Sequence, residues 1–285
     1  MKLRALSGAV VLFLAGCGAS TTPATSTTPT IPSNGPITYT VEPFDMDGTL
    51  GITMTVTQLQ FGGKMCPCVK IPYPADGFHD QQGADAINAA SAKFKPGDTL
   101  MGFSLGVQVI SLYLSKHTLP AGVHVLLAGD TFARNDSLNS TGAGIPANIA
   151  NDVTMVVNEY DGWSDLPTKT SSPNWLLAEG NSTAGTQIMH YYINADVKNP
   201  ANVVTHRGNI TAILVPTQRL PRNDWMRLLG GNAAADALDI KQRPLINDAY
   251  DRPGSNTQQQ AAASAEQVPY PQPAITQKPE PVFGK

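Results

Sequence analysis

The feature that most constrains this chain is a serine flanked by glycines, at the junction of a predicted strand and a predicted helix. Residues 102–106 (GFSLG) match the pattern G-x-S-x-G. Residues 99–103 are mostly apolar and predict a strand, whereas residues 105–116 are largely apolar, contain no proline and predict a helix. Such a junction presents a serine at the carboxyl edge of a parallel sheet, so we interpret Ser104 as a candidate nucleophile. The alternative is a tight strand-to-helix turn that merely contains a serine.

The neighbours of this serine fit the same interpretation. A sharp turn leaves no room for side chains two residues to either side, which explains Gly102 and Gly106. The backbone N–H of Leu105 opens the predicted helix, where it can donate to a developing oxyanion. The glycine pair Gly62 and Gly63 is the candidate for a second oxyanion donor.

The rest of the chain alternates apolar runs with helical patterns. Strands are predicted at residues 50–61, 68–73, 122–129, 152–160, 186–193 and 210–215, and a further helix at residues 83–95. Apolar strands separated by helices indicate an α/β fold in which helices cover both faces of a mostly parallel sheet.

A nucleophilic serine needs a base, and the base needs a carboxylate to orient it. The strand predicted at residues 152–160 runs directly into Asp161, which places this carboxylate at the carboxyl edge of the sheet. Asp165 lies four residues further on in the same loop, where it can also serve to fix the turn before Pro167. We prefer Asp161 and keep Asp165 as the alternate.

Chain order narrows the choice of base. In α/β-hydrolases the serine comes first, then the acid, then the histidine. His79 precedes Ser104, and His117 follows it too closely for an acid to lie between them. We expect His124, inside a predicted strand, to be a buried structural residue. His190 and His206 remain as candidates.

The first residues predict export. A short basic segment is followed by the apolar residues 5–14, too few to span a membrane as a mature helix. Residues 14–17 (LAGC) resemble a bacterial lipobox, in which the cysteine becomes the acylated first residue of the mature protein. We therefore expect residues 1–16 to be a lipoprotein signal peptide, and Cys17 to anchor the protein to the outer face of the cell membrane. An ordinary signal peptide with a chance cysteine is the alternative.

Composition divides the remainder. Residues 17–36 are rich in Thr, Ser and Pro and predict an extended tether, and residues 252–285 are rich in Gln, Ala and Pro and predict a disordered tail. The intervening residues 37–251 form the predicted folded domain. A net charge of −3 offers no basic excess, which argues against a nucleic-acid partner. No later run of 18 apolar residues predicts a transmembrane helix.

Some remaining features carry weaker predictions. Cys66 and Cys68 form a lone C-x-C pair without further ligands at metal-binding spacing, so we expect a disulfide in an oxidising compartment. Asp45 and Asp47 resemble the start of a calcium loop but lack its glutamate, so no metal is expected, nor any other cofactor. The three tryptophans are expected to pack in the core, with the lining of an acyl cleft as the alternative: Trp163, Trp175 and Trp225.

We call the strand-to-helix turn at residues 102–106 the elbow. Beyond it, five segments occur in the order typical of one family. They are LLAGDTFARNDS (126–137), YDGWSDLP (160–167), NWLLAEGNSTAG (174–185), TQIMHYYI (186–193) and TAILVPTQRLP (211–221). With the elbow they cover about residues 98–225, and this stretch resembles the PE-PPE domain, a serine α/β-hydrolase module of mycobacterial envelope proteins. We find no PE or PPE secretion module in the sequence, where the lipoprotein signal stands instead. The first strand and glycine turn of the family cannot be assigned, which leaves the second oxyanion donor open.

The resemblance implies a cutinase-like fold and an enzyme without cofactor. It gives Ser104 as nucleophile, Asp161 or Asp165 as acid and His190 as base, with His206 as the alternate. The implied activity is that of a serine esterase or lipase on acyl esters. The family also contains acyltransferases that move fatty acyl chains between trehalose glycolipids, so a glycolipid substrate is the alternative. A lipoprotein that binds lipid or sugar without catalysis is the third possibility.

Overall fold

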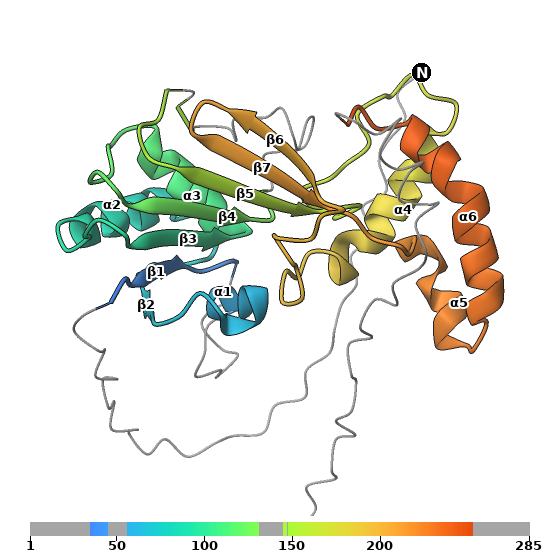
Figure 1. Cartoon of the computed structure of the whole chain (residues 1–285), viewed down its shortest axis with the longest axis horizontal. Helices are drawn as coiled ribbons and strands as arrows, with labels where there is room; N and C mark the ends of the chain where they lie inside the picture. Colours follow the sequence, from blue (N-terminus) through green and yellow to red (C-terminus); the bar gives the residue numbers. More distant parts are fainter. Residues whose placement is uncertain (1–34, 45–55, 131–144, 147, 253–285) are drawn as a thin grey trace, which may run out of the picture. The chain divides into compact units, whose positions relative to one another are not determined.

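The chain is built around one seven-stranded sheet. The computed structural model describes residues 35–44, 56–130, 145–146 and 148–252 (Figure 1). The strands are β1 (Thr38–Val41), β2 (Cys68–Lys70), β3 (Thr99–Phe103), β4 (His124–Ala128), β5 (Val153–Asn158), β6 (Val203–Arg207) and β7 (Ile210–Val215). Their order is β2-β1-β3-β4-β5-β7-β6, and only the β6–β7 pair is antiparallel. The predicted α/β class with a mostly parallel sheet is confirmed.

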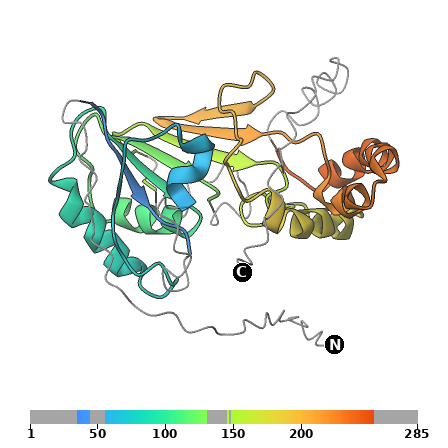
Figure 2. The same cartoon turned by 90° about the horizontal axis from the view of Figure 1, so that it is seen from below.

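Alternating strand residues build a core on each face of the sheet. Leu100, Leu127 and Met155 belong to the larger core, which α2 (Asp80–Ser91) and α3 (Leu105–Leu114) cover. Figure 2 shows these two helices side by side along the strands. Met101 and Phe103 point to the opposite face, where α1 (Val56–Leu59) and the 3-10 helix η1 (Gln60–Gly63) pack. The sheet is therefore buried on both faces, as parallel sheets require.

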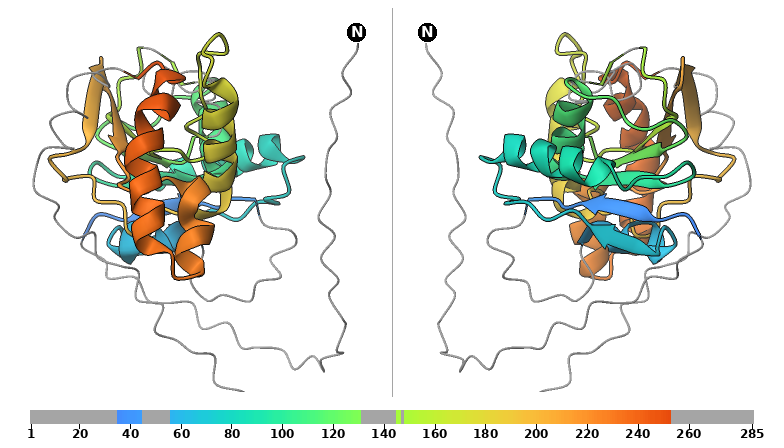
Figure 3. Two further views of the ribbon diagram at one scale, coloured as in Figure 1. Left: turned by 90° about the vertical axis from the view of Figure 1, so that its right-hand side faces the viewer. Right: turned by 90° about the vertical axis from the view of Figure 1, so that its left-hand side faces the viewer.

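A second group of helices follows the later strands. It consists of α4 (Trp175–Ile188), η2 (Pro221–Asn223), α5 (Asp224–Leu228) and α6 (Asn232–Asp248). Figure 3 (left) shows α4, α5 and α6 next to one another. A third apolar cluster joins α4 and α6 to the loop after β5 through Ala178, Ile246 and Tyr160. None of the helices in the described part of the chain has the length and apolar character needed to cross a membrane.

Two predicted strands are wrong. Residues 56–63, most of which fall in the strand predicted at 50–61, form α1 and η1, because Thr57 donates to Val41 O at 3.1 Å and Gln60 donates to Val56 O at 2.8 Å. These side chains satisfy backbone groups that a strand would have used in a ladder. The strand predicted at 186–193 is instead the end of α4 followed by a turn.

Several sequence predictions concern residues that the structure does not describe. The signal peptide, Cys17 and most of the tether lie there, as do Asp45, Asp47 and the tail from residue 253.

Candidate active site

Ser104 occupies a strained turn between β3 and α3. Its backbone has φ 52° and ψ −117°, in the left-handed half of the map that residues with a Cβ rarely adopt. A methyl group on Gly106 would overlap the carbonyl oxygen of Val41, and one on Gly102 would lie 2.8 Å from the carbonyl oxygen of Gly106. The two glycines are therefore required by the close packing of α3 on β1 and β3.

The backbone around the elbow is fixed by its neighbours. Ser104 N–H donates to Ala128 O at 3.0 Å, which ties the turn to the end of β4. Leu105 is the first residue of α3, so its N–H has no partner within the helix and can donate to a bound group. β1, a strand that the sequence analysis did not predict, pairs with β3 and runs beside the elbow.

The glycines proposed as the second oxyanion donor lie beside another segment of the site. Gly62 and Gly63 have φ values of +66° and +72° in η1. Phe61 N–H donates to Tyr192 O at 2.9 Å, and a methyl group on Gly62 would lie 3.5 Å from Ile193 O. Their role toward an oxyanion stays a prediction.

Asp161 and His190 lie against each other next to the elbow. His190 Nδ1 is 3.0 Å from Oδ2 and 3.1 Å from Oδ1 of Asp161. The Asp161 side chain is fully buried and that of His190 is 12% exposed. The His190 ring is 4.9 Å from the ring of Phe103, the residue before Ser104, and it packs against Gly129 after β4. Parallel strands thus bring all three elements to one edge of the sheet.

Three further donors point at the Asp161 carboxylate. Trp163 N–H donates to Oδ1 at 3.0 Å, while the Ser164 hydroxyl at 2.6 Å and the Tyr192 hydroxyl at 2.7 Å both donate to Oδ2. Together these bonds fix the orientation of the carboxylate beside His190. Burial and the charge of Asp161 raise the pKa of Tyr192 well above its ordinary value, so the phenol remains a donor. Sequence reasoning missed Tyr192, although it lies only two residues after the candidate base.

Asn158, the last residue of β5, holds the turn that carries His190. Its Nδ2 donates to Met189 O at 2.7 Å and to Tyr191 O at 3.2 Å, one residue to either side of the histidine. Its backbone N–H donates to the Tyr192 hydroxyl at 3.2 Å. This residue was also missed, because its bonds join segments 31 or more positions apart in the chain.

The loop after β5 that carries Asp161 and Asp165, here called the acid loop, packs directly on α4. A methyl group on Gly162 would overlap Ser182 O and Thr186 Oγ1, and one on Gly185 would overlap Tyr160 O. Tyr160 itself has a positive φ of 63°. The backbone of the loop is therefore in contact with the backbone of the helix that leads to His190.

The Asp165 carboxylate pairs with an arginine, whereas that of Asp161 faces His190. Its carboxylate accepts the Tyr160 N–H at 2.7 Å and pairs with the guanidinium of Arg252, which also reaches Glu159 at 2.9 Å. Arg252 stacks 3.8 Å from the centre of the Tyr250 ring and is buried, although the sequence assigned it to the disordered tail. Burial raises the pKa of Asp165, and the charge of Arg252 acts in the opposite direction.

Two other histidines lie elsewhere. His206 is exposed on the edge strand β6, with Nδ1 3.1 Å from Thr211 Oγ1. Four strand spacings separate β6 from β3, about 19 Å. His124 begins β4 with a side chain that is 52% exposed, so the expectation that it is buried is wrong. His124 is the first residue of β4, and at this end of the strand its ring remains in contact with solvent.

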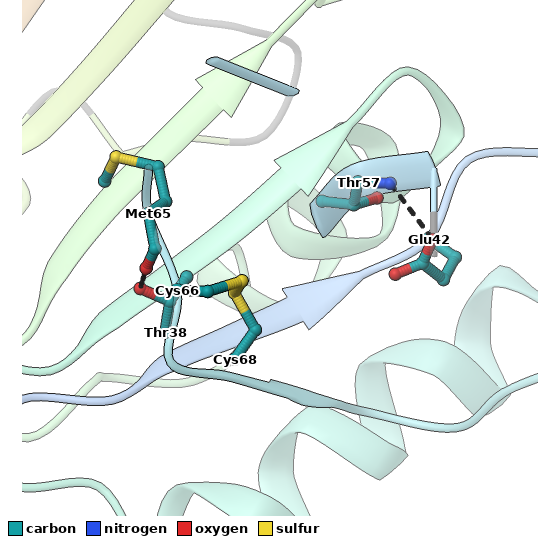
Figure 4. The surroundings of a disulfide bond; sticks show 6 residues. All are labelled: Thr38, Glu42, Thr57, Met65, Cys66 and Cys68. Carbon is teal, nitrogen blue, oxygen red and sulfur yellow. Dashed lines mark hydrogen bonds between the residues drawn. A yellow bond between two sulfur atoms is a disulfide. The ribbon is translucent and has the colours of Figure 1, made fainter. Parts of the chain in front are cut away.

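The remaining predicted features are placed as follows. Cys66 and Cys68 form a disulfide at the start of β2, near Thr38, whose hydroxyl donates to Met65 O at 2.5 Å (Figure 4). Within the described residues, no group of three or more histidines, cysteines or carboxylates could hold a metal. The tryptophans do not pack in the core as expected: Trp163 is 41% exposed, Trp225 is 60% exposed and Trp175 is half-buried.

Comparison with known proteins gives one family and two relatives. The family model described as PE-PPE domain matches residues 81–251. A Mycobacterium tuberculosis protein named diacyltrehalose acyltransferase Chp2 is 30% identical over 183 residues, which cover 61% of this chain and 48% of that protein. A second protein of that organism, named esterase PE16, is 29% identical over 182 residues, covering 54% and 34%. The chain thus spans less than half the length of either relative. No solved structure matches it.

Proposed function

The chain belongs to the PE-PPE domain family, as the sequence resemblance predicted, and from this premise we propose that it is an exported, lipid-anchored serine hydrolase acting on acyl esters. The proposal rests above all on one observation: the buried Asp161–His190 pair beside the strained elbow of Ser104. A serine, a carboxylate and a histidine in this chain order are the parts of an acyl-transfer site.

The proposed reaction follows from which atoms are free. Because Nδ1 of His190 faces Asp161, its Nε2 is left to take the proton of Ser104 Oγ. The oxygen then bonds to the acyl carbonyl carbon, and the Leu105 N–H stabilises the resulting oxyanion. Collapse of this intermediate expels the alcohol, which receives the proton from Nε2. His190 next deprotonates water, whose oxygen bonds to the acyl carbon. Collapse of this second intermediate breaks the bond to Ser104 Oγ, which takes the proton back from Nε2 as the acid is released.

Asp161 stabilises the charged imidazole during both steps. Its carboxylate accepts bonds from Trp163, Ser164 and Tyr192, so it is held in one orientation without needing water. Asp165 is committed to Arg252 and is not available in the same way. His206 lies on a distant strand, which supports His190 as the base.

A second candidate reaction is acyl transfer to a sugar hydroxyl of a trehalose-type envelope glycolipid. The name of the relative at 30% identity favours it, and that of the relative at 29% identity favours hydrolysis. Both reactions use the same acyl-enzyme and differ in whether water or a sugar hydroxyl accepts the acyl group. The third candidate, binding of lipid or sugar without catalysis, has no observation in its favour beyond those the site already explains.

The proposed location rests on the sequence alone. The basic start, the apolar residues 5–14 and the lipobox ending in Cys17 support export and anchoring by acyl chains to the outer face of the cell membrane.

A fluorophosphonate probe, which labels activated serines, tests the proposal on the full chain. We expect Ser104→Ala to abolish labelling and His190→Ala to slow it at least roughly 1000-fold, while His206→Ala serves as the matched control and labels normally. Labelling that survives Ser104→Ala would refute the assignment. With a labelled acyl ester, the ratio of free acid to acylated trehalose glycolipid then separates hydrolysis from transfer.

A further inference from the structure

Helix α5 and the turn that joins it to α6 expose three large apolar side chains. Trp225 is 60% exposed, Leu228 is 85% exposed and Leu229 is 79% exposed. Gly230 and Gly231 follow and complete the turn. A cluster of this kind on the surface marks an interaction site more often than it does a packing defect. We call these three side chains the apolar tip.

The one charged residue of residues 225–231 is turned away from the surface. Arg227 has a side chain only 7% exposed, and its guanidinium contacts three carboxylates. They are Asp224 at 2.8 Å, Asp236 at 2.7 Å and Asp239 at 2.5 Å. Because two of these acids lie on α6, the arginine fastens α5 to α6, and its charge is met by carboxylates instead of being presented to solvent.

The tip is also fixed in its backbone. Gly231 N–H donates to Met226 O at 2.9 Å, and Gly230 N–H donates to Arg227 O at 3.0 Å. Arg222, just before α5, donates to Leu177 O of α4 at 3.0 Å. The exposed side chains are thus presented by a rigid turn that is anchored to α4, the helix that ends just before His190.

The size and chemistry of the tip favour a lipid surface over a protein. Trp and two Leu offer roughly 400 Å² of contact, about half of the ~800 Å² that each partner buries in a stable protein interface. A small group of apolar side chains that includes a tryptophan suits the boundary between headgroups and acyl chains. Other exposed apolar side chains lie near the candidate base: Trp163, Ile188 and Tyr191.

The chain outside the described residues indicates which surface this is. The 20 residues from 17 to 36 can span at most roughly 70 Å, so an anchor at Cys17 would keep the folded domain at the membrane. We infer that the apolar tip of Trp225, Leu228 and Leu229 inserts into the membrane that carries the anchor. The choice of partner rests on the proposed lipid anchor and is independent of the catalytic assignment.

Fluorescence of the full chain reconstituted in vesicles tests this inference. The vesicles contain phosphatidylcholine and phosphatidylglycerol, with or without brominated acyl chains, which quench tryptophan on contact. The spectrum of the Trp225→Phe variant is subtracted from that of the native chain to isolate Trp225. We expect the Trp225 emission to be shifted to the blue and quenched at least twofold by brominated lipid. Leu228→Ser with Leu229→Ser should reduce that quenching.

A matched control variant lies outside the tip. Val204→Ser removes a side chain that is 46% exposed on β6 and should leave the quenching of Trp225 unchanged. The tip variants should hydrolyse a water-soluble short-chain ester normally but lose about tenfold in rate on an ester dispersed in vesicles.

The outcomes distinguish the two proposals. The inference is overturned if the chain floats with the vesicles but Trp225 is not quenched. It is also overturned if the chain does not float with the vesicles at all. If the Trp225 emission shifts to the blue without lipid, and the shift follows dimer formation measured by sedimentation, the tip contacts a second copy of the chain. That result would also overturn the inference. Quenching without any ester hydrolysis leaves the inference standing and removes the proposed activity.

Discussion

Replacing Gly185 with alanine tests the contact between α4 and the acid loop. In a free helix this change stabilises by about 1 kcal/mol, because glycine is the poorer helix former. At Gly185, however, the new methyl group overlaps the carbonyl oxygen of Tyr160. Since real Cβ contacts stay beyond 3.0 Å, one of the two backbones must move by about 1 Å. We therefore expect a net loss of roughly 2 kcal/mol in the free energy of unfolding.

Gly180 provides the matched control in the same helix. A methyl group there has no neighbour within 4 Å, so Gly180→Ala should gain the full propensity of about 1 kcal/mol. For a domain of this size, 1 kcal/mol corresponds to about 2–4 °C in Tm. The two substitutions should thus move Tm in opposite directions, by roughly +3 °C at Gly180 and −6 °C at Gly185.

The Gly185→Ala and Gly180→Ala variants should also differ in kcat. A shift of about 1 Å in the loop or the helix moves Asp161 relative to His190, and a misplacement of that size can cost about 100-fold in rate. Thermal unfolding gives the stabilities, and turnover of a soluble ester gives kcat. If both variants raise Tm equally and keep full activity, α4 does not rest on the Tyr160 carbonyl and the description of the acid loop is wrong.

Three other substitutions address the shell around the candidate triad. Tyr192→Phe removes a donor to the Asp161 carboxylate and should lower kcat roughly tenfold or more at every pH, without removing a limb of the pH–rate profile, because the raised pKa keeps the phenol protonated. Asn158→Asp replaces the amide donor by an oxygen that faces two carbonyls, so kcat should fall about tenfold with KM nearly unchanged in steady-state kinetics. Arg252→Gln removes the guanidinium that pairs with the buried carboxylates of Asp165 and Glu159, and should lower stability by about 3–5 kcal/mol in chemical denaturation, a loss that Asp165→Asn in the same chain should partly restore.

The hydrophobic pattern of the sequence was sufficient to predict those helices and strands that depend mainly on their own residues. β3 and the start of α3 lie where the sequence placed them, since a buried parallel strand and an apolar helix each carry a continuous signal. It failed at residues 56–63, where alternating residues resemble a strand but polar side chains bond to β1 and to the helix itself. Tertiary partners decide such a segment, and no window of sequence contains them.

The candidate site divides in the same way. Ser104 and Asp161 could be predicted because each follows a strand that the sequence identifies. The shell around them could not, because Gln60, Asn158 and Tyr192 meet from distant segments: Tyr192 N–H donates to Gln60 Oε1 at 2.6 Å across 132 positions. Hydrogen bonds of this kind leave no periodic signal in a sequence.

The two aspartates of the acid loop show how much of the site is decided outside the sheet. In sequence they differ only in their distance from β5, and both are buried. What separates them is Arg252, which comes from beyond α6 and takes Asp165, while α4 brings His190 to Asp161. The helices that carry the apolar tip therefore belong to the same group as those that orient the acid and the base. It follows that loss of Arg252, which reaches Asp165 from beyond α6, should lower kcat as well as stability, even though the nucleophile itself follows β3.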